Sequence, residues 1–369
     1  MSEIRFLKQA DMPEVTRLFQ KIFRNSAQQP SDALSAYLQR LYIGFANEPE
    51  PASKVLINDN GDVTGFIGVN YYNYIHEGKP LKTAIAGALM VDNHEQDPLG
   101  GARLMRSLLD DHYDLIATET ASETTAAMWK KLNAVQLTGY SLDWLRIIRP
   151  LGFAVETAAS KIGLLNMLRP AADFIDRRKR NAMPGNSLRW SATPQNWLAG
   201  QALECKEINA AEFSELYAQF SDAFSCRPQW SGQQLSLRLE DAQLKPAYGQ
   251  PHMVKAETKT GKAVGVFLYH LRKDHTARVL ELFSHPKASS QVIDALINHA
   301  AQRGAVAIRG RTKPDMMEAM LGKRIAFTHL ASTMVWAKDA TLLTPFTESK
   351  ALLNGLAGEH WSRLSGDPL

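Results

Sequence analysis

The feature that most constrains the fold is an order of predicted elements that occurs twice along the chain. From residue 3 to 148, hydrophobic patterns predict a strand, two helices, a meander of strands, and then a helix, a strand, a helix and a strand. The same order returns in outline beyond residue 190. Helices that alternate with strands in both halves predict an α/β protein of two similar domains, each with a central β-sheet flanked by helices.

The domain boundaries follow from where this order stops and resumes. The final strand of each half is predicted over residues 139–150 and 327–338. The intervening segment carries the basic run Arg177–Arg180 and the breaker Pro184–Gly185, so we expect a helical connector there. The expected units are an N-terminal domain over 1–149, the connector over 150–190, a second domain over 191–340 and a C-terminal tail over 341–369.

Charge and cysteine content exclude several classes of protein. The 42 basic and 38 acidic residues leave a net charge of +4, which is too small for a typical polyanion-binding protein. The 2 cysteines, Cys205 and Cys226, indicate a reduced, cytoplasmic chain without a disulfide framework. The N-terminus lacks the apolar run of a signal peptide, and charged residues interrupt the apolar stretch 145–168, so we expect no membrane span.

The segment Asp97–Met105 joins a predicted strand to a predicted helix and carries small residues at Gly100, Gly101 and Ala102. Small residues let a ligand approach the backbone, and the amides of a helix's first turn attract anions. The segment therefore suits a pyrophosphate, although an ordinary turn and helix start is the alternative. Neither a P-loop nor a Rossmann fingerprint is present, which argues against nucleotide hydrolysis and hydride transfer.

The order of elements over 3–148 and this turn together resemble the GNAT superfamily of acyl-CoA-dependent N-acyltransferases. In that superfamily a turn of the form [RQ]xxGx[GA] binds the CoA pyrophosphate; here Gly100 and Ala102 match, and Asp97 replaces the Arg or Gln. The resemblance implies two GNAT-like mixed sheets and acetyl-CoA or another acyl-CoA as co-substrate, without a metal. It also implies a set of CoA-binding residues, namely Met90, Val91, Leu99, Gly100, Gly101, Ala102, Arg103 and Trp129.

The second marker of the superfamily is a helix of the form NxxAxxLYxKxGF, whose outline Ser122–Ala134 keeps. Trp129 stands at the position of the Tyr. A phenol can protonate a leaving thiolate, whereas an indole N–H is not acidic enough, so the role of the acid is vacant or lies elsewhere. The alternative for Trp129 is packing of the helix against the sheet.

An acyltransferase also needs a group that removes a proton from the attacking amine. The candidates are Asp92, His94 and Glu95 beside the turn, and Glu119 at the end of the following strand. Each could instead be a solvated loop residue. Glu119 is favoured, because a carboxylate at the carboxyl end of a central strand points into the crevice where open α/β sheets bind ligands.

The second half resembles the same fold without its cofactor turn. The corresponding junction, Ser284–Leu296, contains no glycine, so side chains would occupy the space that a pyrophosphate needs. We therefore expect the second half to bind no CoA and to support the first, or to form one wall of the acceptor site. The histidines of this half lack the spacing of a zinc site, and no metal is expected.

The resulting prediction is an N-acyltransferase that acts on a small-molecule amine, an amino sugar or a peptide amine, with a homodimer left open. One alternative is a Fem-like transferase that takes its donor from aminoacyl-tRNA, in which the basic run Arg177–Arg180 would contact the RNA. A second alternative is a non-catalytic protein of the same fold, which Asp97 and Trp129 would permit.

Overall fold

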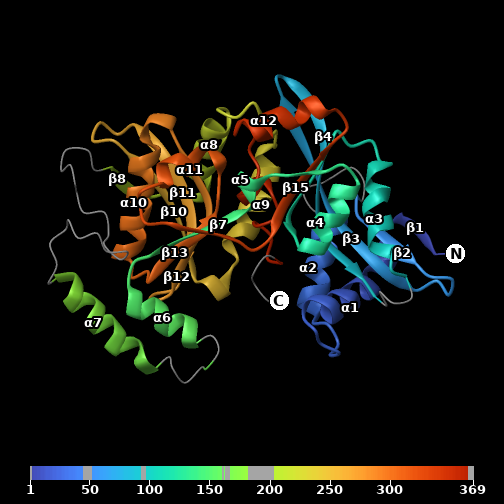
Figure 1. Cartoon of the computed structure of the whole chain (residues 1–369), viewed down its shortest axis with the longest axis horizontal. Coiled ribbons are helices and arrows are strands. Elements are labelled where there is room, and N and C mark those ends of the chain that lie inside the picture. Colours follow the sequence, from blue (N-terminus) through green and yellow to red (C-terminus); the bar gives the residue numbers. More distant parts are fainter. Residues whose placement is uncertain are drawn as a thin grey trace.

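The computed structural model describes residues 2–44, 52–92, 97–159, 162, 167–181 and 203–364. Within these ranges the chain forms two mixed β-sheets, each covered by helices, which confirms the predicted α/β class (Figure 1). None of the helices described in these ranges is long and apolar enough to cross a bilayer.

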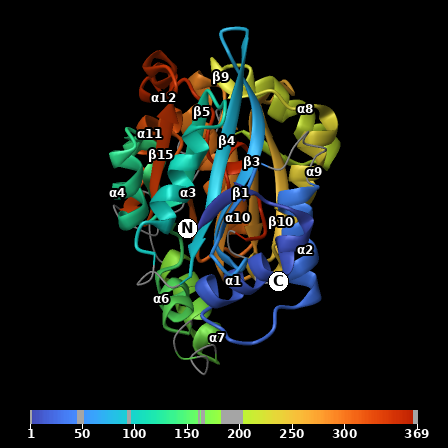
Figure 2. The same ribbon diagram turned by 90° about the vertical axis from the view of Figure 1, so that its right-hand side faces the viewer.

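The first sheet is built around a long hairpin, β3 (Val63–His76) and β4 (Lys79–Val91). Its strand order is β1–β2–β3–β4–β5–β15–β6, and β9 pairs with the far end of β3 (Figure 2). The bounds of these further strands are β1 (Glu3–Phe6), β2 (Lys54–Ile57), β5 (Leu115–Ala121), β6 (Val135–Gln136), β9 (Cys226–Pro228) and β15 (Ser332–Ala337).

Two pairs of helices cover the two faces of this sheet. In α1 (Met12–Phe23), the side chains of Val15, Leu18 and Phe19 recur at helical spacing and are buried. They join one apolar cluster with α2 (Asp32–Ile43), whereas α3 (Gly100–Leu109) and α4 (Glu123–Lys131) contribute to another. A short helix, α5 (Thr138–Ser141), follows β6.

The second sheet has the order β14–β7–β13–β12–β11–β10–β8. Its strands are β7 (Leu142–Ile147), β8 (Glu204–Glu207), β10 (Gln250–Glu257), β11 (Ala263–Leu271), β12 (Thr276–Ser284), β13 (Ala307–Arg311) and β14 (Ala326–His329). The connector helices α6 (Pro150–Ala159) and α7 (Arg169–Asn181) pack against each other. The α-helices between β8 and β14 in the chain are α8 (Ala210–Ser221), α9 (Gly232–Gln243), α10 (Ser289–Gln302) and α11 (Pro314–Met320).

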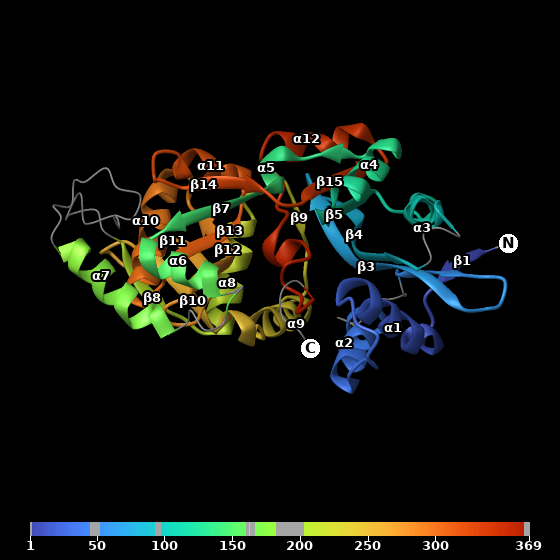
Figure 3. The same ribbon diagram turned by 60° about the horizontal axis from the view of Figure 1, so that its bottom comes forward.

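The two halves exchange a strand, which the expected boundaries did not anticipate. β7 precedes residue 149 but lies between β13 and β14 of the second sheet, while β15 lies between β5 and β6 of the first. Figure 3 shows β7 between β13 and β14, and β15 beside β5. Trp144 of β7 is buried in the second core, and Met334 of β15 is buried in the first. The prediction of one strand over 327–338 is therefore corrected, because the chain divides there into β14 and β15, which enter different sheets.

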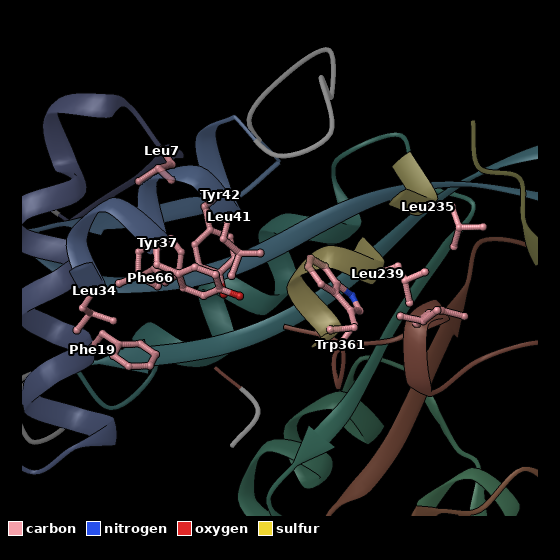
Figure 4. Packing of buried hydrophobic residues seen from close by; sticks show 14 of the residues in the cluster. Leu7, Phe19, Leu34, Tyr37, Leu41, Tyr42, Phe66, Leu235, Leu239 and Trp361 are labelled. Atoms are coloured by element: carbon pink, nitrogen blue, oxygen red, sulfur yellow. The ribbon is translucent and has the colours of Figure 1, made fainter. Parts of the chain in front are cut away.

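The segment expected as a C-terminal tail is part of the core. After α12 (Thr344–Thr347), residues 351–364 run between the halves (Figure 3), and we call them the C-terminal strap. Leu352, Leu356 and Trp361 of the strap are buried in one cluster with α1, α2, α8 and α9, and Figure 4 shows Trp361 in this packing. A tail of polar residues would not bury such side chains, so the expected boundary at residue 341 is corrected.

Candidate active site

The first sheet opens between β4 and β5. These parallel neighbours pair only through Thr83–Ile85 and Leu115–Ala117. Beyond that point β4 contains a bulge, since its register with β3 shifts and Ala88 adopts a φ of 49°. A bulge bends its strand and increases the local twist. The two strands therefore diverge toward their carboxyl ends, where ligands of open α/β sheets bind.

Glu119 lies in this opening, at the carboxyl end of β5, with a side-chain exposure of 0%. Its Oε2 accepts a hydrogen bond from the backbone N–H of Glu359 and lies 3.2 Å from Nδ1 of His360. Burial acts to raise the pKa of Glu119, but the charge and hydrogen bond of His360 outweigh it and the net pKa is lowered. Glu119 is therefore held as a carboxylate.

His360 responds in the opposite sense. Burial acts to lower its pKa, but the neighbouring Glu119 carboxylate outweighs this effect, so the net pKa of His360 is raised. With Nδ1 directed at Glu119, the other ring nitrogen is the one available to a substrate. The pair has the arrangement of a general base and the carboxylate that orients it.

Glu359 fills the space between the diverging strands. Its Oε1 accepts from the Thr118 hydroxyl at 3.0 Å and from the Glu119 amide at 3.3 Å, and its Oε2 accepts from the Thr120 hydroxyl at 2.7 Å. A Cβ atom at Gly87 of β4 would lie only 3.3 Å from this carboxyl group. Burial, together with the charge of Glu119, raises the pKa of Glu359 to about 7.

The strap that carries Glu359 and His360 is fixed on both sides of them. Nε1 of Trp361 donates to the Tyr72 hydroxyl at 2.7 Å and to the Gly358 carbonyl at 2.8 Å. Lys245 of the second half donates to the Ser362 carbonyl, and the Arg363 amide donates to the Tyr37 hydroxyl at 2.7 Å. These contacts hold the two titratable side chains at the opening of the first sheet.

A cavity of about 590 Å³ lies between the two halves at this point. One wall comes from α1, α2 and the opening of the first sheet, and the opposite wall comes from β12 and β13 of the second. The first wall includes Phe19, Phe23, Leu41, Tyr42, Gly87 and Glu119, with Glu359 and His360 from the strap. The second wall includes Arg278, Val279, Leu280, Arg309, Gly310 and Arg311. The volume is sufficient for a small organic substrate.

The predicted pyrophosphate turn begins helix α3, as expected from its sequence. A Cβ atom at Gly101 would lie 3.6 Å from Val91, which is ordinary contact, whereas one at Gly100 would lie 2.9 Å from Leu56. Gly100 therefore permits close packing of the helix on β2, and Gly101 leaves a small space facing β4 and α4. The exposed Leu99 and the partly buried Ala102 and Val91 border this turn.

Asp97 alters the charge of the turn. Its carboxylate lies 3.1 Å from Nη1 of Arg103, which also donates to the hydroxyl of Ser2 at 2.8 Å. The same carboxylate would lie 3.1 Å from a Cβ atom at Gly100. A negative charge thus stands at the helix N-terminus, where a pyrophosphate would be attracted. Asp97 therefore opposes a diphosphate at this turn in charge.

The other candidate residues lie in different surroundings. Met90 is buried in the cluster of α1 and α2, and Trp129 is buried among the side chains of α3, α4 and the sheet. Asp92 forms an ion pair with Lys21 at 2.6 Å. His94 and Glu95 fall outside the described residues. Of the candidate bases, the structure thus brings Glu119 to the cavity. The CoA contacts stay predictions.

The sequence interpretation missed Glu359 and His360. They are about 240 residues from Glu119 along the chain, and no periodic pattern connects them to it. A usable signal was present, because large apolar residues such as Leu352, Leu356 and Trp361 are unusual in a free tail. Among the residues that the structure describes, no group of three or more His, Cys, Asp or Glu side chains could hold a metal ion.

Comparison with known proteins identifies the fold. No family model matches the sequence, and no curated protein matches it. A GCN5-related N-acetyltransferase from Kribbella flavida has 14% identity and a TM-score of 0.55 over 92% of this chain and 72% of its own. A GCN5-related N-acetyltransferase from Anabaena variabilis has 10% identity and a TM-score of 0.59 over 92% of this chain and 73% of its own.

A third solved structure, a probable N-acyltransferase from Enterococcus faecalis, has 10% identity and a TM-score of 0.58. It covers 91% of this chain and 73% of its own. Because these matches extend over both halves, the chain has two GNAT-like domains with mixed sheets, as the resemblance implied. At such low identity the likeness establishes the fold, and function has to be argued from the site.

Proposed function

We propose that this protein is an N-acyltransferase that moves an acyl group from acyl-CoA to an amine in the cavity between its halves. The fold of the solved N-acetyltransferases and the opening between β4 and β5 support this class of reaction. The observation that carries the proposal is the Glu119–His360 pair, which lies at that opening and lines the cavity. Amino sugars and peptide amines remain the proposed acceptors.

The proposed reaction needs one base. The nitrogen of the neutral amine attacks the thioester carbonyl, its proton passes to the free ring nitrogen of His360, and the C–S bond breaks with its electrons on sulfur. The imidazolium then returns this proton to the thiolate, which leaves as a thiol. Glu119 orients the ring and stabilises its charge, so Glu119 acts as a positioning residue and His360 replaces it as the proposed base.

One observation favours a second candidate, a protein of this fold that does not use CoA. The carboxylate of Asp97 stands at the N-terminus of α3, where it would repel a diphosphate. Such a protein would either take its acyl group from another kind of donor, such as aminoacyl-tRNA, or bind a ligand without catalysis. Titration of the protein with CoA by calorimetry separates this candidate from the first, because only the acyltransferase requires saturable CoA binding.

The catalytic proposal is tested by thiol release from acetyl-CoA in the presence of a panel of amines. We expect amine-dependent release, and a loss of about 100-fold in kcat for His360→Gln, which is the usual size of a general-base contribution. His285→Gln is the matched control, because His285 is exposed and does not line the cavity. An unchanged kcat in His360→Gln would rule out this residue as the base.

The role of Glu119 has a separate signature in the pH profile. Because the Glu119 carboxylate raises the pKa of His360, Glu119→Gln should move the rising limb of the rate profile toward lower pH while reducing kcat. A loss of rate at every pH with no displacement of the limb would indicate a structural role only.

A further inference from the structure

Three neighbouring strands place nitrogen-bearing side chains in one row on the cavity wall of the second half. In the register of the sheet, His270 of β11 is opposite Arg278 of β12, and Arg278 is opposite Arg309 of β13. All three side chains line the cavity. Residues directly opposite each other on adjacent strands point to the same face and lie about 5 Å apart, so the row is a continuous feature.

The positive charge of this row is poorly compensated. Among the described residues, no carboxylate lies within 4.0 Å of a nitrogen of Arg278, whose guanidinium stacks 4.2 Å from the centre of the Tyr248 ring. The one carboxylate of the described part of the chain that forms an ion pair with Arg309 is that of Asp143, at 3.8 Å, and it is closer to Arg311, at 3.2 Å. Arg311 itself donates hydrogen bonds to the carbonyl oxygens of Glu119, Tyr140 and Ala331.

Two adjacent guanidinium groups in a partly enclosed site repel each other unless an anion lies between them. Burial lowers the pKa of Arg278, and the charge of Arg309 lowers it further. His270 is buried beside them and is kept neutral, since burial lowers its pKa to about 4. Both of its ring nitrogens are buried, and the backbone of Ala242 and Gln243 lies close to them, so His270 adds no charge to the row.

The opposite end of the same cavity has the opposite character. Glu119, Glu359 and His360 lie there, where a substrate amine would be deprotonated. The cavity is therefore bipolar, with Glu119 and Glu359 on the first wall and, on the second, three arginines beside the single carboxylate of Asp143 among the described lining residues. An acceptor that matches it carries an amine at one end and a negative charge at the other.

We propose that the acceptor is an amine that bears an anionic group, either a carboxylate or a phosphate, bound by Arg278 and Arg309 of the second half. The planar guanidinium forms paired hydrogen bonds with both kinds of oxyanion. Acylation of the bound amine rests on the proposed acyltransferase function. The anion site depends only on residues of the second wall. This wall then determines which acceptors the first half can use.

The test uses matched pairs of ligands that differ only in the anionic group. Glycylglycine and glycylglycinamide report on a carboxylate, and glucosamine 6-phosphate and glucosamine report on a phosphate. Affinities are measured by calorimetry at low salt on the full chain without acyl-CoA. We expect the anionic member of at least one pair to bind at least tenfold more tightly than its neutral partner, and the pair that responds identifies the anion.

Substitutions test whether Arg278 and Arg309 are the residues that bind the anionic group. Arg278→Gln and, separately, Arg309→Gln should weaken binding of the anionic ligand about 10- to 100-fold and leave its neutral partner unchanged, while Arg278→Lys should restore part of the loss. Arg272→Gln is the control, since this exposed residue of the same half lies outside the cavity. Thermal melting of each variant verifies its folding. If Arg278→Gln does not fold, the affinities of Arg309→Gln decide the test.

Two results would overturn the inference: equal or undetectable affinity for both members of both pairs, or a preference that persists in both arginine variants. Because binding is measured without the acyl donor, a protein that selects the anionic ligand but releases no thiol would refute the acyltransferase function and keep the anion site. Thiol release with no preference between the paired ligands would support the acyltransferase function and refute the anion site.

Discussion

At the scale of single residues, the site contains two neighbouring carboxyl groups whose pKa values are shifted in opposite directions. Glu119 is paired with His360 and has a lowered pKa, whereas burial and the charge of Glu119 raise the pKa of Glu359 to about 7. Two buried carboxylates side by side repel each other, so one of them takes up the proton. This difference makes the stability of the strap dependent on pH.

The sign of that dependence follows from the raised pKa of Glu359. In the unfolded chain this group ionises near 4.5, so the folded state binds the extra proton between there and about 7, and its stabilising effect is lost as pH rises through 7. We expect urea unfolding to give a free energy on the order of 2 kcal/mol lower at pH 8.5 than at pH 5.5.

Glu359→Gln should remove most of this decline, and the remainder comes from His360, whose raised pKa acts in the same direction. Glu348→Gln, at an exposed position, is the control. Its free energy of unfolding should decline between pH 5.5 and 8.5 as much as that of the unchanged protein. If Glu359→Gln kept the full slope as well, the proton would have to be bound elsewhere.

Asp97 is the residue that most affects the proposed CoA site. Asp97→Gln removes the negative charge at the N-terminus of α3 and releases Arg103 from its ion pair, so both changes favour a diphosphate. We expect the affinity for CoA in calorimetry to rise about three- to tenfold. Asp110→Asn makes the same change of charge at the other end of the helix and should not strengthen binding.

At the scale of elements, the exchange of β7 and β15 makes each sheet depend on the other half of the chain. Val335 of β15 is fully buried and pairs with Ala117 of β5 and Val135 of β6. The first sheet is therefore incomplete without a strand that comes about 200 residues later in the sequence. Neither half can be treated as a separate folding unit.

Val335→Asp should therefore destabilise the N-terminal half. Burying an unpaired carboxylate at this position should cost about 3 kcal/mol or more, and amide hydrogens of β5 should exchange faster in a mass-spectrometric measurement. Leu321→Asp, at an exposed position of the same region, should change stability by less than about 0.5 kcal/mol. Unchanged protection of β5 in Val335→Asp would mean that β15 contributes little to the first sheet.

The elements show what the sequence could predict and what it could not. The β2–β3 hairpin follows from alternating side chains and from the turn at Asn58–Gly61, where Gly61 adopts a φ of 89°. Periodicity gives the buried face of a strand but does not identify its partner, so the exchange of β7 and β15 was not predictable. Glu119 was predictable because a strand end fixes its place, whereas His360 reaches the site only through packing of the strap.

At the scale of the whole molecule, contacts between the halves form the site. Arg311 of the second sheet binds Asp143 and donates to the Glu119 carbonyl at 3.0 Å, so one guanidinium connects both sheets beside the cavity. The ring of Trp230, which meets the Tyr72 ring edge-on, and the guanidinium of Arg238 add further contacts with Tyr72. The second half thus supports the first mechanically and, by our inference, also selects its acceptor.

The position of His360 so late in the sequence has a consequence for biosynthesis. A ribosome that has translated every other part of the proposed site still holds an inactive polypeptide until this histidine and Trp361 emerge from the exit tunnel and fold back beside β5. Nascent chains and prematurely terminated products would therefore be unable to consume the acyl donor. The activity would begin only when translation has passed the last element that the two halves share.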